Sequence, residues 1–210
     1  MIFCFGYAQK SSENTKEIII TKHISKEEFD NHAKSMDFCR YYSHLKEVHS
    51  LIKYNGIKLL EYMNSTSDNK NIKVIKDEQV GFEGNRLLVN YLTSLGMFID
   101  YGKKEMGKAL GKNASEQFVK KTNELYDKCL SYRFLILMRN YAVHYSFPLH
   151  IYVKSLNSPS GLFVKRDILL RFDGWKHVKV DIQEMPDTIM IEPHVINMQK
   201  YIKPLLAQWS

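Results

Sequence analysis

The stretch that decides the fold runs from Asn113 to Phe147 and reads NASEQFVKKTNELYDKCLSYRFLILMRNYAVHYSF. Apolar and aromatic side chains recur along it with the three- and four-residue spacing of a buried helix face. Asn113 or Ser115 suits the helix cap, and Pro148 cannot continue the helix. The pattern therefore predicts one long helix that ends near Ser146 or Phe147. Its buried stripe consists of Phe118, Leu125, Cys129, Tyr132, Ile136 and Val143.

The segments before this stretch also predict helices. Ser25-Lys26-Glu27-Glu28 is a capping box, in which the serine caps the helix and the glutamate reaches back to it. It opens a helical region that we expect to run to about Met63, with Asn55-Gly56 as a candidate interruption or kink. Residues 64–71 are polar and predict an exposed loop. A second helix is expected from about Glu83 to Leu110.

The two ends of the chain carry β-like patterns. Residues 1–24 hold two short apolar runs around a polar stretch, which fits either a β-hairpin or a flexible arm. Residues 149–190 contain a hairpin pattern around Pro159 and Gly161, with further candidate strands at 168–172 and 178–182. A last helix begins near Pro193.

The expected fold is therefore mainly α: an up-and-down helical bundle with a small β-hairpin insertion before the last helix. We divide the chain into an N-terminal β-like arm at residues 1–24 and a helical domain at residues 25–210. The insertion occupies about 149–190 of that domain.

Composition narrows the class of protein. The chain has 210 residues, 44% of them hydrophobic, which suits one domain with a sizeable core. Its net charge of +7 suits a polyanionic partner or simply solvated helix faces. Three cysteines without a CxxC pair favour a reducing compartment over disulfides or a zinc site. With no signal peptide and no membrane-length apolar run, we expect a cytoplasmic protein.

The clearest pointer to chemistry is Arg139-Asn140-Tyr141-Ala142-Val143-His144, near the end of the long helix. In that setting it resembles the signature of the HEPN superfamily, whose all-α domains include many metal-independent ribonucleases. The resemblance covers residues 83–147, and the first and last helices follow in topology only. The alternative is that Arg139 and His144 only cap the helix, because cations are favoured at helix C-termini.

The resemblance implies an endoribonuclease of a prokaryotic defence or toxin–antitoxin system. HEPN proteins bring two copies of the motif together in a homodimer, so RNA, a second copy and an antitoxin or regulatory protein are the expected partners. Arg139 would stabilise the phosphate and His144 would move protons, with Asn140, one turn before it, orienting the imidazole. No cofactor or metal is implied. The rival hypothesis is a non-catalytic HEPN module that binds RNA, a nucleotide or a protein.

Other candidate residues are less specific. Arg171 and His177, with five residues between them, have a similar spacing to Arg139 and His144. They span a predicted turn, so we interpret them as a chance match. Arg133 could extend a phosphate-binding surface or lie on a solvated helix face. Tyr141 and Tyr145 are expected in the core or at a dimer interface; family toxins often carry a tyrosine two residues after the histidine, where this chain has Ser146. A lysine cluster fits either an RNA-backbone patch or a solvated surface: Lys103, Lys104, Lys108, Lys112, Lys120 and Lys121.

Overall fold

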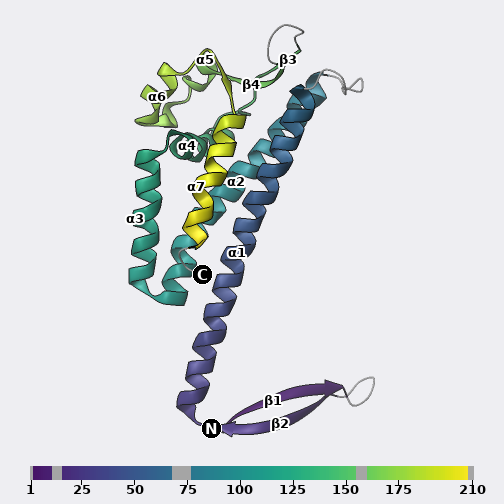
Figure 1. Cartoon of the computed structure of the whole chain (residues 1–210), viewed down its shortest axis with the longest axis vertical. Coiled ribbons are helices and arrows are strands. Elements are labelled where there is room, and N and C mark those ends of the chain that lie inside the picture. The colour runs from purple at the N-terminus through teal and green to yellow at the C-terminus, as the bar shows by residue number, and fades with distance from the viewer. Residues whose placement is uncertain (1, 11–15, 68–76, 155–159, 208–210) are drawn as a thin grey trace.

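The computed structural model describes residues 2–10, 16–67, 77–154 and 160–207, and it is mainly helical (Figure 1). The long helices are α1 (Lys26–Ser67), α2 (Asp77–Leu110), α3 (Lys112–Lys128), α4 (Leu130–His144) and α7 (Glu192–Ala207). The remaining elements are β1 (Phe3–Lys10), β2 (Lys16–Ile24), β3 (Ile151–Val153), β4 (Gly161–Lys165), α5 (Arg166–Leu169), the 3-10 helix η1 (Asp173–Trp175), α6 (Val178–Glu184) and β5 (Thr188–Met190). The predicted mainly α class, with a β-hairpin before the last helix, is confirmed.

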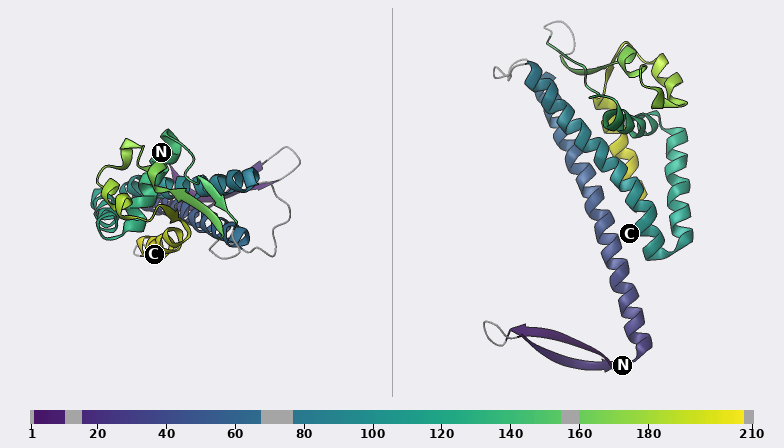
Figure 2. Two further views of the ribbon diagram at one scale, coloured as in Figure 1. Left: turned by 90° about the horizontal axis from the view of Figure 1, so that it is seen from above. Right: turned by 180° about the vertical axis from the view of Figure 1, so that it is seen from behind.

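α1 and α2 are longer than predicted and lie side by side (Figures 1 and 2). α1 ends at Ser67, so residues 64–67 of the predicted loop are helical, and the rest of that loop lies outside the described residues. The candidate interruption at Asn55-Gly56 is wrong, because α1 continues through it. Gly56 instead allows Gln199 of α7 and Tyr91 of α2 to approach the α1 backbone.

The single long helix predicted from Asn113 to Phe147 is wrong. The chain forms α3 and α4, separated at Cys129, whose backbone is extended with φ −122° and ψ 106°. No glycine or proline marks this break in the sequence. The predicted cap is also wrong: Gly111 precedes α3, and the Ser115 hydroxyl donates to the carbonyl of Lys103 at 2.9 Å. In Figure 1, α4 is seen nearly along its axis, so it crosses the other long helices.

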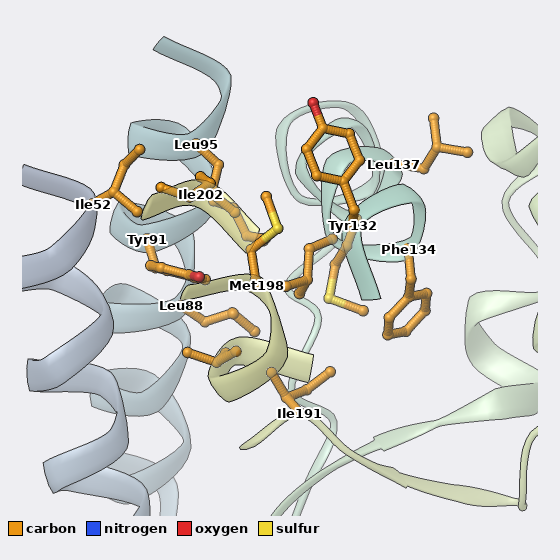
Figure 3. Packing of buried hydrophobic residues seen from close by; sticks show 14 of the residues in the cluster. Ile52, Leu88, Tyr91, Leu95, Tyr132, Phe134, Leu137, Ile191, Met198 and Ile202 are labelled. Atoms are coloured by element: carbon orange, nitrogen blue, oxygen red, sulfur yellow. The ribbon is translucent and has the colours of Figure 1, made fainter. Parts of the chain in front are cut away.

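On the two sides of the break, the apolar residues of α3 and of α4 pack against different elements. Phe118 of α3 packs against α2 where Gly102 leaves room for its ring. Phe134 and Leu135 of α4 instead join the central core, where Met198 of α7 is also fully buried. Figure 3 shows side chains of α7 between those of α1 and α2 on one side and those of α4 on the other.

The insertion contains more helix than predicted. β3 and β4 form the expected hairpin, and β5 extends it as a third antiparallel strand. The candidate strands at 168–172 and 178–182 are wrong, since α5 and α6 lie there. Val178 and Ile182 are both fully buried, and their four-residue spacing puts them on one helix face as readily as it fits a strand pattern.

The N-terminal arm is a β-hairpin, as one of the two interpretations predicted. β1 and β2 are antiparallel, with a register shift between Phe5 and Gly6. The capping box is confirmed: the backbone N–H of Glu28 donates to the Ser25 hydroxyl at 3.1 Å, and the backbone N–H of Ser25 donates to the Glu28 carboxylate at 2.8 Å. Figure 2 shows the hairpin and the start of α1 projecting away from the other helices.

Candidate functional site

The motif lies at the C-terminal end of α4, which an aromatic cluster fixes in place. The ring of Trp175, fully buried in η1, stacks on Phe134 and Tyr141 with centroid distances of 6.0 and 5.7 Å. Phe172 meets Tyr141 edge-on at 5.6 Å. Tyr141 is therefore a core residue, as one of the two alternatives predicted, and it anchors the middle of the motif.

Arg139 is half-buried and lies over the backbone of α2. Its side chain occupies the space above Gly96, where a Cβ atom would lie 2.7 Å from Cδ and 2.8 Å from Cζ of the arginine. Its Nε is buried without a hydrogen-bond partner in the part of the chain that the structure describes. Its two terminal nitrogens form no hydrogen bond with another described residue, so these donors are left for a ligand.

Arg139 also differs from the other arginines because it has no carboxylate partner in the part of the chain that the structure describes. The other five arginines of the chain each lie within 4 Å of one: Arg40 with Asp37, Arg86 with Glu83, Arg133 with Asp181, Arg166 with Asp187 and Arg171 with Asp167. Among the described residues, no carboxylate comes that close to Arg139. A half-buried guanidinium without a counter-ion is a site that favours an anion, because its charge is only partly solvated.

His144 and Asn140 occupy the solvent-facing side of α4. His144 is exposed and Asn140 is partly buried. Five residues place Arg139 and His144 roughly 140° apart around the helix axis. Across residues 77–154, no hydrogen bond joins Arg139, Asn140 or His144 to one another, so the orienting role of Asn140 stays a prediction.

Exposed apolar side chains surround this end of α4. Val143, Tyr145 and Phe147 are 58%, 49% and 56% exposed. They follow one another within and just beyond the motif, beside His144. The prediction that Val143 lies on the buried stripe is therefore wrong, and Tyr145 also packs on Tyr141 and Phe172 of its own chain. Exposed apolar side chains close together in sequence make this helix end a candidate contact surface.

His150, which the sequence did not single out, supports the motif from beneath. Its Nδ1 accepts a hydrogen bond from the backbone N–H of Lys165 at 2.9 Å, and its Nε2 lies 3.1 Å from the Tyr141 hydroxyl. Because Nδ1 accepts, the neutral ring carries its proton on Nε2 and donates it to Tyr141. Burial lowers the pKa of His150, so this neutral form is favoured. Only its neighbourhood in the fold could have revealed this residue.

The chain after the motif is fixed by a second buried contact. The side-chain amide of Asn85 in α2 donates to the carbonyl of Leu149 and accepts from its backbone N–H, both at 2.9 Å. These two hydrogen bonds hold the segment after Pro148 against α2. The end of the motif is therefore anchored by Tyr141 within it and by Leu149 just after it.

The less specific candidates lie elsewhere or serve the fold. Arg133 forms a two-bond ion pair with Asp181 of α6, both bonds 2.8 Å long, so neither alternative for it, a phosphate surface or a solvated position, is correct. Arg171 pairs with Asp167, whereas the His177 ring contacts Tyr126. In the lysine cluster, two members pair with glutamates: Lys108 with Glu105 at 3.7 Å and Lys112 with Glu116 at 3.4 Å.

No protein-family model, curated protein or solved structure matches this chain. The HEPN resemblance therefore stays a prediction that rests on the motif and its position. In the part of the chain that the structure describes, none of the helices combines the length and the apolar character needed to cross a membrane.

Proposed function

We propose that this protein is a metal-independent endoribonuclease of the HEPN type, acting as a homodimer in a prokaryotic defence or toxin–antitoxin system. The observation that carries the proposal is Arg139, the arginine with no carboxylate partner among the described residues. It lies in the same helix end as an exposed histidine. An RNA phosphate would supply the missing negative charge.

The geometry of one chain supports a homodimer. Arg139 points toward α2, whereas His144 lies on the solvent-facing side of α4, so one copy makes an incomplete site. A second copy packed over Val143, Tyr145 and Phe147 would bring a second arginine and histidine to the same place. Two histidines can then act as base and acid.

In the proposed reaction, a neutral His144 removes the proton of the ribose 2′-hydroxyl, and the 2′-oxygen attacks the adjacent phosphorus. A protonated His144 from the other copy donates its proton to the 5′-oxygen as the P–O5′ bond breaks. The products are a 2′,3′-cyclic phosphate and a free 5′-hydroxyl. Arg139 stabilises the additional negative charge on the phosphate oxygens as it develops.

The test is incubation of the purified protein with mixed cellular RNA in EDTA. We expect wild-type protein to leave 2′,3′-cyclic phosphate ends. His144→Ala should lower the rate roughly 10²–10⁴-fold because it removes the proton carrier. Arg139→Ala should lower it roughly 10²–10³-fold because it removes the charge on the phosphate.

The matched controls are Arg171→Ala and His177→Ala, the second Arg and His pair of the chain. Neither Arg171 nor His177 contacts Arg139 or His144. Both control variants should therefore cleave RNA at the wild-type rate. Full activity of His144→Ala would refute the proposed chemistry. If the wild type and all variants bind RNA but none of them cleaves it, a non-catalytic HEPN module is favoured instead.

A further inference from the structure

Gly96 lies in the interior of α2, directly beneath Arg139. The three nearest atoms to a Cβ at this position all belong to the Arg139 side chain: Nε, Cδ and Cζ. The Cδ and Cζ distances of 2.7 and 2.8 Å are shorter than any Cβ contact that proteins tolerate. Any other residue at position 96 would therefore require the guanidinium to move.

Among the glycines of α2, Gly96 is the one that the Arg139 side chain covers. Gly81 lies in the same helix, yet a Cβ there would meet nothing within 4 Å. A glycine inside a helix is less favourable than alanine because it restricts a more flexible backbone. At Gly81 nothing in the described residues offsets that cost, whereas at Gly96 the missing Cβ provides the space that Arg139 occupies.

We propose that Gly96 is a positioning residue for Arg139: because Gly96 has no side chain, the guanidinium can lie flat against α2. The Nε group then faces the helix, and the two terminal nitrogens are left to meet an anion. This inference rests on the proposed function for its consequence, RNA cleavage, but the contact itself can be tested separately.

Alanine at position 96 tests the contact with little risk to the fold, because the atoms that must move belong to the end of a flexible side chain. The experiment compares Gly96→Ala with Gly81→Ala as the matched control, each in the full chain with and without Arg139→Ala. Three properties are measured: the NMR resonance of the Arg139 Nε–H group, the urea midpoint of unfolding, and cleavage of an RNA oligonucleotide.

We expect Gly96→Ala to shift the Arg139 Nε–H resonance and lower RNA cleavage at least tenfold, while Gly81→Ala changes neither. Both substitutions replace a helical glycine, so Gly81→Ala should raise the urea midpoint. Gly96→Ala should raise it similarly only when Arg139 has been removed, because the two positions are coupled. Should Gly96→Ala alone fail to fold, Arg139→Ala should restore folding.

A wild-type resonance and cleavage rate in Gly96→Ala would overturn the inference, as would failure of Arg139→Ala to restore folding. If wild-type protein cleaves no RNA, the proposed ribonuclease function fails by itself. In that case the resonance and the coupled midpoints still decide whether Gly96 positions Arg139.

Discussion

At the scale of single residues, His150 links the motif to solution pH. Its ring is neutral in the fold, since Nδ1 accepts from Lys165 and burial lowers its pKa below the ordinary 6.5. The unfolded chain therefore binds a proton more readily than the folded chain. Above about pH 6.5, His150 has no effect of this kind on the free energy of unfolding. As the pH falls from about 6.5 toward the lowered pKa, the free energy of unfolding decreases by up to about 1.4 kcal/mol per pH unit.

We expect His150→Asn to reduce this acid sensitivity, because its side-chain oxygen can replace Nδ1 as the acceptor without titrating. Urea unfolding at pH 7.5 and 5.5 measures the effect. The variant should be less stable than wild type at pH 7.5, where it lacks the bond to Tyr141, but should lose less stability on acidification. Burial also lowers the pKa of His194, so part of the acid sensitivity should remain in the variant. His144→Ala is the control and should retain the wild-type slope; an unchanged slope in His150→Asn would contradict the prediction.

At the scale of elements, the ion pair between Arg133 and Asp181 attaches α6 to α4. Both bonds are 2.8 Å long and both side chains are mostly buried. Asp181→Asn should lower the free energy of unfolding by about 1–2 kcal/mol, since it leaves a partly buried guanidinium without its counter-ion. Hydrogen exchange should quicken first in α6.

The matched control is Asp167→Asn, which breaks the exposed pair with Arg171 at 3.7 Å. Exposed pairs contribute little, so its effect should stay within about 0.5 kcal/mol. Equal effects of the two substitutions would show that the Arg133 pair does not attach α6.

The sequence predicted the elements whose signals are local. The capping box at Ser25 and the hairpin of β3 and β4 depend on neighbouring residues, and both were found. For residues 1–24 the sequence left a hairpin and a flexible arm open, and the structure has the hairpin. The break at Cys129 could not be predicted, because no glycine or proline marks it in the sequence. On its two sides Phe118 packs over Gly102 of α2, whereas Phe134 stacks on Trp175. α6 was mistaken for a strand because a short apolar run fits both periods.

The same distinction applies to the candidate site. Arg139, Asn140 and His144 were predicted from their order, their place near the end of a helix and the resemblance to the HEPN signature, and the structure places them at one end of α4. Gly96 and His150 lie far from Arg139 or outside the motif in sequence, so their contacts with it arise only from the fold. That no described carboxylate lies near Arg139 is likewise a property of its surroundings in the fold.

At the scale of the whole molecule, the N-terminal arm stands apart from the helices that carry the motif (Figure 1). The hairpin meets α1 through Phe3 on Phe29 and Phe5 on His32, with ring centroids 4.7 and 4.6 Å apart. An exposed ion pair of Lys22 with Glu28, at 3.5 Å, also joins β2 to α1. The buried core begins only at Leu45 along α1. A two-stranded hairpin contributes little stability by itself.

We therefore expect removal of residues 1–24, with Ser25 kept as the cap of α1, to leave the cooperative unfolding of the remaining chain almost unchanged. Calorimetry should give a Tm within about 3 °C of wild type, because the core from Leu45 onward is untouched. Leu59→Ala, at a fully buried position of α1, is the contrasting control and should cost about 2–5 kcal/mol. A large fall in Tm on removing the arm would mean that the hairpin packs on the helices, or on a second copy, more extensively than its ring contacts and its ion pair indicate.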